Sequence, residues 1–353
     1  MSYSLNSKIS NLSAYEPIKG NYKIRLDANE SPYLPDDEFL NEFKDAIESI
    51  EFNRYPDPCA AELTKAFSDY YEISEDCVTV SNGSDEMLSI LESTFLEKGD
   101  RVLVIEPDFS MYRFYSSLYE VECISIDKDS NLNVDLESVL KKIQEEKISM
   151  VIFSNPCNPT GQGIEADKVR NFIRKADCLV ILDEAYMDFW NQSLIKETQS
   201  FDNLVVLRTA SKAVGCAALR LGFAVSNKTI TSALKAVKSP YNVNSVSQKF
   251  GTIVYKNKIK LKNRLKNIVN NRDLLYNKLK VIQNDVMTFE VMPATANFVY
   301  IKTPDAEQIQ EFLRNNSIAV RNIGNGLRIT AGTEQEINET VDTIKLFFKQ
   351  RGV

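Results

Sequence analysis

From about residue 76 to residue 226, short runs rich in Val, Ile and Leu alternate with segments of helical periodicity. Several of these runs are apolar nearly throughout, as strands buried on both faces are. The alternation predicts an α/β domain, in which helices sandwich a mostly parallel sheet. The expected strands are Val78–Val80, Val102–Ile105, Val121–Ile126, Met150–Phe153, Leu179–Leu182, Leu204–Leu207 and Leu221–Val225, and the expected helices include Glu86–Leu96, Leu136–Ile143 and Ala166–Ala176.

After residue 245 the pattern changes. A long helical region is followed by short apolar runs near residues 289–292, 298–301, 318–320 and 327–330 and by a terminal helix. This order predicts a smaller α+β domain. We therefore expect a large α/β domain at residues 45–245, with residues 1–44 and 246–353 forming an N-terminal arm and the small domain. A chain of 353 residues, 43% of them apolar, is long enough for two such cores.

The chain contains no histidine. This absence excludes Ser-His-Asp triads, Cys-His dyads and metal sites with histidine ligands. The six cysteines occur singly, without a Cys-x-x-Cys pair, so neither a structural metal nor a disulfide framework is expected. Acid–base chemistry must therefore use Lys, Tyr, Cys, carboxylates or a cofactor.

The net charge of −7 argues against a nucleic-acid partner, because binding to phosphates needs a basic surface. Residues 256–280 hold nine Lys or Arg and one acid, but leucines and isoleucines recur there at helical spacing. The segment is therefore predicted to be an amphipathic helix with a charged outer face. No apolar stretch is long enough to span a membrane, and the first twenty residues lack a signal-peptide pattern, so we expect a cytoplasmic protein.

Ligands of open α/β sheets bind at the carboxyl ends of the strands, and four polar clusters follow predicted strands. The first, Ser81–Glu86, leads into a helix, for which Ser84 is a suitable N-cap. Free backbone N–H groups at a helix start bind phosphate, although the motif alone also fits a plain capped helix. The second, Asn155–Gly161, has two Asn-Pro steps and forms a turn that presents Asn158 at the sheet edge.

The third cluster begins at Asp183, at the tip of a buried strand. A carboxylate there is either a cap for the next turn or the counter-charge of a protonated ring nitrogen. In the fourth, Lys212 follows Ser211 and precedes Arg220 by eight residues. A lysine in a buried pocket can react with an aldehyde, whereas an arginine fork suits a phosphate. Together the four clusters predict pyridoxal 5′-phosphate (PLP) as the cofactor.

The order of these motifs resembles that of the class I and II aminotransferases of PLP fold type I, and among them the histidinol-phosphate aminotransferases. The resemblance runs nearly from end to end of the chain. The segments that carry it, besides the four clusters, are Leu12–Pro17, Leu26–Tyr33, Asn53–Pro58, Pro240–Asn244 and Leu327–Thr333.

The resemblance implies a role for each matching residue. Lys212 would hold the cofactor covalently and then serve as general base and acid, while Asp183 would keep the pyridine nitrogen protonated. Tyr186 and Asn158 would bond the ring oxygen, and Tyr112 would stack on the ring. The expected phosphate ligands are Gly83, Ser84, Asp85, Thr209, Ser211 and Arg220, joined by Tyr55 from the other subunit of a homodimer. The expected substrate ligands are Tyr15, Asn29, Arg321 and Arg328.

The activity that the resemblance implies is transamination of L-histidinol phosphate with 2-oxoglutarate, a step of histidine biosynthesis. Two alternatives keep the same cofactor: an aromatic amino-acid aminotransferase and a decarboxylase of O-phospho amino acids such as threonine phosphate. A cofactor-binding regulatory domain is a further alternative, but the full set of Lys, Asp, Tyr, Asn and Arg residues in the motifs favours an enzyme. One departure from the family pattern is the short spacing of seven residues between Arg321 and Arg328.

Overall fold

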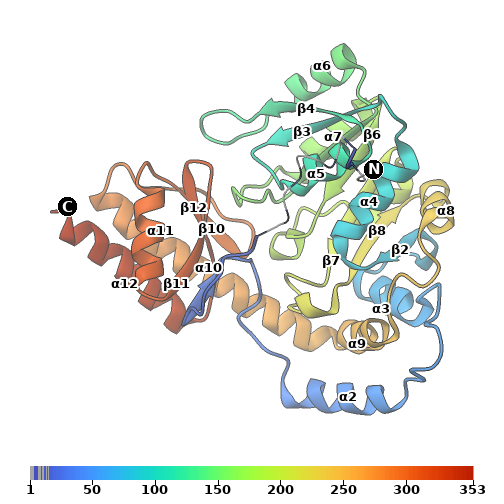
Figure 1. The fold of residues 1–353 in the computed structure, drawn as a ribbon, viewed down its shortest axis with the longest axis horizontal. Coiled ribbons are helices and arrows are strands. Elements are labelled where there is room, and N and C mark those ends of the chain that lie inside the picture. The colour runs from blue at the N-terminus through green and yellow to red at the C-terminus, as the bar shows by residue number, and fades with distance from the viewer. Residues whose placement is uncertain (1–3, 7–8, 10–11, 13, 15, 353) are drawn as a thin grey trace.

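In the computed structural model, which describes residues 4–6, 9, 12, 14 and 16–352, a seven-stranded sheet forms the centre of the larger body (Figure 1). Its strand order is β2-β8-β7-β6-β5-β3-β4. The bounds of these strands are β2 Val78–Ser81, β3 Arg101–Glu106, β4 Glu122–Asp127, β5 Met150–Ser154, β6 Leu179–Asp183, β7 Leu204–Thr209 and β8 Gly222–Ser226.

Six strands of this sheet run in one direction, and only β8 runs antiparallel, to β2 and β7. The predicted mostly parallel sheet is confirmed. All seven expected strands are present, with ends shifted by one or two residues at several positions.

Alternate side chains of the strands enter two different hydrophobic clusters, one on each face of the sheet. On one face Leu182 and Val206 pack in a cluster with residues of α3 (Ala61–Tyr71), α6 (Leu136–Glu146), α7 (Ala166–Lys175) and α9 (Ser245–Lys256). On the other face Ile181 and Val205 pack with residues of α4 (Gly83–Phe95), α5 (Met111–Leu118) and α8 (Lys228–Val237). The domain therefore has the three layers expected of the α/β class.

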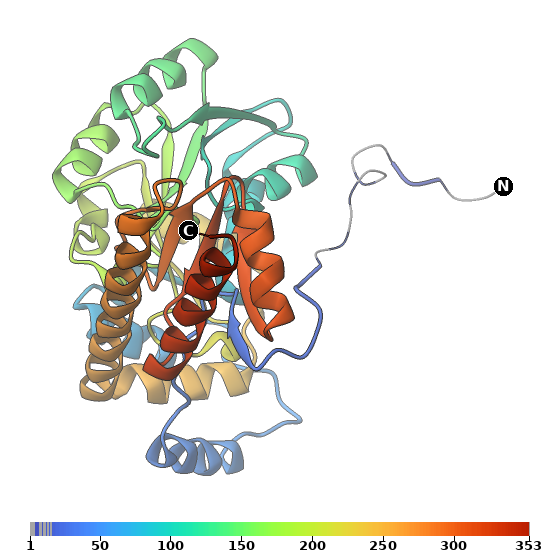
Figure 2. The same ribbon diagram turned by 90° about the vertical axis from the view of Figure 1, so that its left-hand side faces the viewer.

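A second sheet of five strands, in the order β1-β11-β12-β10-β9, forms the smaller body at the left of Figure 1. Its strands are β1 Ile24–Leu26, β9 Glu290–Val291, β10 Phe298–Lys302, β11 Ile318–Ile323 and β12 Gly326–Thr330. The helices α10 (Lys258–Asp285), α11 (Ala306–Asn315) and α12 (Glu334–Gln350) lie together beside it (Figure 2). The sequence did not predict β1, which pairs with β11 in parallel.

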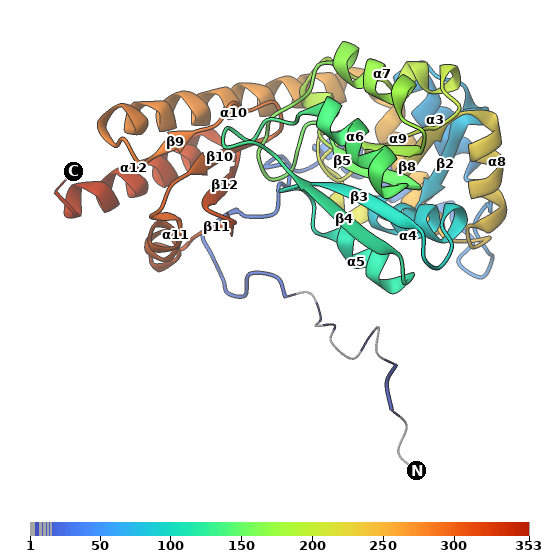
Figure 3. The same cartoon turned by 90° about the horizontal axis from the view of Figure 1, so that it is seen from above.

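Helix α10 extends from the small sheet to the large domain, where it meets α9 (Figure 3). As predicted for the basic segment, its buried face is mostly apolar: Leu261, Ile268, Leu275 and Leu279 are buried there, together with Arg272. No helix within the described residues is long and apolar enough to cross a membrane.

Hydrophobic packing assigns the connecting segments to one body or the other. Helix α2 (Asp37–Glu48) contributes Phe39 and Phe43 to the cluster of the large domain, which continues through α9 as far as Leu261. Ile24 and Leu26 of β1 belong to the cluster of the small sheet. The division at residues 45 and 245 stays a prediction, and this packing indicates that α2 and α9 belong to the large domain.

Candidate active site

A cavity of about 540 Å³ lies between the carboxyl edge of the seven-stranded sheet and the β11–β12 hairpin. Residues from both bodies line it. The predicted site residues that it brings together are Asn29, Ser84, Asp85, Tyr112, Asn158, Asp183, Tyr186, Thr209, Ser211, Lys212, Arg220, Arg321 and Arg328.

Asp183 ends β6 and is 5% exposed. Its Oδ2 accepts a hydrogen bond from the Tyr112 hydroxyl at 2.8 Å, and its Oδ1 accepts one from the backbone N–H of Ala185 at 3.0 Å. Burial raises the pKa of this carboxyl to about 6, and the two hydrogen bonds oppose the rise. Within the described part of the chain, no lysine or arginine forms an ion pair with Asp183. A buried carboxylate without a cation fits a bound ring that carries a positive N–H.

Lys212 lies in the turn that follows β7, and its Nζ donates to the Ala28 carbonyl oxygen at 2.9 Å. Burial is the main cause that lowers the pKa of this amine to about 8, and the nearby Arg328 adds to the effect. A lysine with a lowered pKa provides more of the neutral amine that attacks an aldehyde. The carbonyl of Ala28 was not predicted to take part in the site.

The start of α4 and Arg220 form the proposed phosphate end of the cavity. Helix α4 begins at Gly83, so the predicted N-cap role of Ser84 is wrong: Ser84 is the second helical residue, and the N-cap, Asn82, makes no capping bond through its side chain. Gly83 has φ +86°, and a Cβ there would lie 2.6 Å from Nη2 of Arg220. That close approach brings the guanidinium against the helix start, where Nη2 reaches Asp85 at 3.3 Å and Nη1 reaches Ser211 Oγ at 3.4 Å.

The first turn of α4 thus combines backbone N–H groups, the positive end of the helix dipole and a guanidinium. The hydroxyl groups of Thr209 and Ser211 lie 3.0 Å apart at this end of the cavity and add two hydroxyl donors. This donor set fits a phosphate group. Together with the buried carboxylate and the lysine, it matches the functional groups of PLP.

Asn158 and Tyr186 lie between the two bodies. Asn158 Oδ1 accepts from Nη1 of Arg328 at 2.5 Å, and the Tyr186 hydroxyl accepts from Asn29 Nδ2 at 2.9 Å. Asn29 also bonds Thr330 of β12 through its backbone N–H at 3.1 Å. In the structure Asn29 therefore orients Tyr186, while its predicted contact with the substrate stays a prediction.

Arg321 and Arg328 are paired residues on β11 and β12. The two-residue turn Gly324–Asn325 joins the strands, so the short spacing noted in the sequence places the two arginines directly opposite each other. Arg328 is 7% exposed, and its Nη2 donates to the Asp27 carbonyl oxygen at 2.6 Å. Arg321 is half-buried and forms no ion pair with a residue that the structure describes.

Two of the predicted residues that the structure describes do not line the cavity. Gly83 lies behind Arg220, as described above. Tyr55 is 80% exposed, stacks on Tyr241 with ring centroids 4.5 Å apart, and lines a different surface pocket. Tyr15 lies outside the described residues.

Sequence reasoning missed Asp108, which also lines the cavity. Its Oδ2 accepts from the Ser154 backbone N–H at 3.0 Å, its Oδ1 accepts from the Ser154 hydroxyl, and the Asn158 N–H donates to that hydroxyl at 3.0 Å. Asp108 thus fixes the loop that presents Asn158. It comes two residues after β3, so the same rule about strand ends could have found it.

Comparison with known proteins agrees with this geometry. A family model, "Aminotransferase class I and II", matches residues 21–344. The chain belongs to the class I and II aminotransferases. This membership confirms the predicted enzyme class and its PLP cofactor.

A relative of this chain from Clostridium novyi is named histidinol-phosphate aminotransferase. The two are 40% identical over 344 residues, which cover 96% of this chain and 95% of the relative. The crystal structure of a histidinol-phosphate aminotransferase from Sinorhizobium meliloti, in complex with PLP, has a TM-score of 0.84 and 20% identity over 93% of this chain and 92% of that one. L-threonine-O-3-phosphate decarboxylase from Porphyromonas gingivalis has a TM-score of 0.78 and 18% identity, covering 92% and 99% of the two chains. The fold is therefore shared by proteins of both names, and only the site can distinguish their reactions.

Proposed function

We propose that this aminotransferase transfers the amino group of L-histidinol phosphate to 2-oxoglutarate, giving imidazole-acetol phosphate and glutamate. The curated relative at 40% identity carries the corresponding name. The observation that carries the proposal is the pair Arg321 and Arg328, opposite each other across the β11–β12 hairpin at the cavity wall.

The cations that line the cavity suit this substrate. They are Lys212, Arg220, Arg321 and Arg328. Arg220 belongs to the phosphate end formed by α4. The other two arginines of the lining lie together, with Arg328 held in place by Asn158 and the Asp27 carbonyl. Two guanidinium groups match one phosphate dianion.

The residues of the chain divide the work as follows. Bound PLP supplies an electron sink for the carbon next to the amine. Asp183 would hold the positive charge of the ring nitrogen. The Lys212 amine, whose pKa burial lowers, would take a proton from that carbon and return it to the aldehyde carbon of the cofactor, on the other side of the transferred nitrogen. Tyr186 and Asn158 orient the ring oxygen, and Arg321 and Arg328 position the substrate phosphate.

We further propose that the enzyme is a cytoplasmic homodimer in which Tyr55 completes the phosphate site of the other subunit. Two observations support the dimer. Tyr55 is 80% exposed and lines a pocket other than the active-site cavity of its own chain. Its stacking on Tyr241 also leaves two large aromatic side chains at the surface, since Tyr241 is 46% exposed.

The direct test mixes the PLP-bound protein with one amino donor and no keto acid in a stopped-flow spectrometer. L-Histidinol phosphate should abolish the visible absorbance of the bound cofactor much faster than phenylalanine or glutamate does. Faster conversion with phenylalanine would show an aromatic amino-acid aminotransferase. Release of CO₂ from O-phosphothreonine would show a decarboxylase.

Arg321→Gln provides the matching variant, because it removes one of the two paired guanidinium groups. We expect kcat/KM for histidinol phosphate to fall by about 10- to 100-fold, the range for one hydrogen bond to a charged group. Histidinol, which lacks the phosphate, is the control and should be converted by the variant and the wild type at similar rates. An equal loss for both compounds would contradict the assignment of the phosphate to this arginine.

A further inference from the structure

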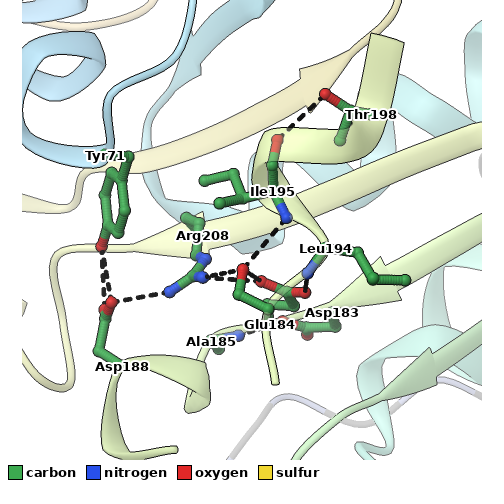
Figure 4. A network of polar contacts seen from close by, with 10 residues as sticks. Tyr71, Asp183, Glu184, Ala185, Asp188, Leu194, Ile195, Thr198 and Arg208 are labelled. Carbon is green, nitrogen blue, oxygen red and sulfur yellow. Dashed lines mark hydrogen bonds and ion pairs between the residues drawn. The ribbon is translucent and has the colours of Figure 1, made fainter. Parts of the chain in front are cut away.

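A buried cluster of charged side chains lies behind the active-site edge of the large sheet (Figure 4). Arg208, on β7 and 2% exposed, is its centre. Its Nη2 forms an ion pair with Glu184 at 2.7 Å, and its Nη1 forms one with Asp188 at 2.8 Å. The hydroxyl of Tyr71 donates to the same Asp188 at 2.9 Å, and the guanidinium lies 4.9 Å from the centre of the Tyr71 ring.

Each partner of Arg208 is held in turn by other groups. Glu184 accepts from the Ser193 hydroxyl at 2.6 Å and from the Leu194 backbone N–H at 2.8 Å. Ser193 Oγ also accepts from Arg208 at 2.7 Å. Both acceptors are charged, Glu184 is fully buried and the Asp188 side chain is only 12% exposed, so the one guanidinium group fixes two carboxylates at defined positions.

The members of this cluster are neighbours in sequence of residues in the cofactor site. Glu184 follows Asp183, the last residue of β6, and Arg208 precedes Thr209, the last residue of β7. Successive side chains of a strand point to opposite faces of the sheet. Asp183 and Thr209 therefore face the cavity, whereas Glu184 and Arg208 meet on the other face, on the side of α3.

We infer that Arg208 is a positioning residue for the cofactor. On the face of the sheet away from the cavity it links the ends of β6 and β7, and it thereby fixes the positions of Asp183 and Thr209 on the face that lines the cavity. Asp188 extends the same tie to the turn Met187–Phe189 that follows Tyr186. Arg208 itself does not line the cavity and acts only through the backbone of its neighbours. The inference rests on the proposed role of Asp183 as a cofactor ligand.

Arginine is needed at this place because lysine has one ammonium group and cannot address two carboxylates through a planar fork. In Arg208→Lys the charge stays, but one of the two ties is lost. Glu184→Gln keeps the acceptor for Leu194 and removes the ion pair with Arg208. Tyr71→Phe is the matched control. It removes the hydrogen bond that the Tyr71 hydroxyl donates to Asp188 and leaves both ion pairs of Arg208.

The experiment measures PLP binding to the cofactor-free variants by absorbance titration, at a temperature well below the melting temperature of the least stable one. At that temperature a variant that has only lost stability is still fully folded, so its dissociation constant for PLP equals that of the wild type. We expect Arg208→Lys and Glu184→Gln to raise the dissociation constant at least about tenfold, since a displaced Asp183 weakens a hydrogen bond between charged groups, which is worth about 10- to 100-fold in binding. Tyr71→Phe should keep it within about twofold of the wild type.

A second readout is the pH midpoint of the visible absorbance of the bound cofactor, which depends on where Asp183 lies. It should shift in Arg208→Lys and stay fixed in Tyr71→Phe. Folded Arg208→Lys with wild-type affinity and an unchanged midpoint would overturn the inference, and Glu184→Gln decides in the same way if Arg208→Lys does not fold. Asp183→Asn separates the two hypotheses. If it binds PLP like the wild type, the proposed role of Asp183 fails. If it binds PLP weakly while Arg208→Lys and Glu184→Gln bind like the wild type, only the role of Arg208 is overturned.

Discussion

Two ionisable side chains of the active site have pKa values displaced toward each other. Burial raises the pKa of the Asp183 carboxyl to about 6 and lowers that of the Lys212 amine to about 8. In both cases loss of water disfavours the charged form, which is an anion for Asp183 and a cation for Lys212. The enclosed site therefore needs a ligand that carries a positive charge to the carboxylate and consumes the amine, as PLP does.

The pKa of Lys212 predicts how the binding rate of PLP depends on pH. Only the neutral amine attacks the aldehyde, so the association rate should rise about tenfold per pH unit below pH 8 and level off above it. Stopped-flow absorbance of cofactor-free protein mixed with PLP between pH 6.5 and 9 measures this rate. A variant Lys212→Ala, which cannot form the covalent link, is the control. A rate still rising steeply at pH 9 would contradict the lowered pKa.

Asp183 predicts a change of stability with pH in the cofactor-free protein. A carboxyl whose pKa is raised on folding binds its proton more tightly in the folded state, so the free energy of unfolding falls as pH rises from about 4 to about 6. Asp183→Asn removes that loss. At pH 7.5 the cofactor-free variant should be more stable than the wild type by up to about 3 kcal/mol, whereas at pH 4 the two should differ little. Urea unfolding at the two pH values measures the difference, and an advantage that does not depend on pH would refute the explanation.

At the scale of the elements, the site depends on how closely β8 approaches the start of α4. A Cβ on Gly222, the first residue of β8, would lie 2.3 Å from the carbonyl carbon of Gly83. Gly83 in turn has φ +86° and leaves room for Arg220. Because Gly222 and Gly83 have no side chains, β8, the start of α4 and the Arg220 guanidinium can pack closely enough to form the phosphate end of the cavity.

Gly222→Ala is therefore expected to push α4 away from β8. Backbone atoms cannot give way as a flexible side chain does, so PLP affinity should fall by at least about tenfold, and the melting temperature should fall as well. The control is Gly99→Ala, whose Cβ would meet nothing within 4 Å although its φ of +95° is unfavourable for alanine. It should lose stability and keep its PLP affinity. Equal affinity of the two variants would contradict this account of the phosphate end.

The sequence predicted the elements that local periodicity encodes. The strands that end at Asp183 and Thr209 were found from their apolar runs, and the rule about strand ends then placed Asp183 and Lys212 in one site. The sequence did not predict β1, because this strand has only three residues and pairs with β11 almost 300 residues later. The start of α4 was placed three residues late, since a helix that begins at a glycine without a side-chain cap has no start signal in its sequence.

Contacts between distant segments were also beyond the sequence. Nothing local shows that the Lys212 amine bonds the Ala28 carbonyl, or that Arg208 meets both Glu184 and Tyr71. These contacts join different elements and exist only after the sheet has formed. The register of Arg321 and Arg328 is an intermediate case: their spacing was visible, but the two-residue turn that puts them opposite each other was not recognised.

At the scale of the whole molecule, the active site lies between two bodies with separate hydrophobic cores. The large domain supplies Lys212, Asp183 and Arg220, and the small sheet supplies Arg321 and Arg328. Arg328 joins the two bodies, because Nη1 bonds Asn158 of the large domain and Nη2 bonds the Asp27 carbonyl after β1. The proposed site of the substrate phosphate therefore lies where the bodies meet.

The proposed homodimer predicts that two inactive variants restore each other. Lys212→Ala lacks the catalytic amine, and Tyr55→Ala lacks the ring that would reach the other subunit. In a mixed dimer, the Tyr55→Ala subunit provides Lys212 for one site and the Lys212→Ala subunit provides Tyr55 for that same site, so one site of two is intact. If the subunits exchange at random, half of the dimers are mixed, and activity should reach about one quarter of the wild-type value.

The measurement unfolds a 1:1 mixture of the two variants, refolds it with PLP and assays it beside each variant refolded alone. Refolded wild type gives the yield, and sedimentation confirms the dimer. A second mixture, of Lys212→Ala with Asp183→Asn, shows whether restoration needs a residue that crosses between subunits: Asp183 and Lys212 line the same cavity of one chain, so neither site of that mixed dimer is intact. Activity of the first mixture no greater than the mean of its parents would mean that Tyr55 serves no site of the other subunit.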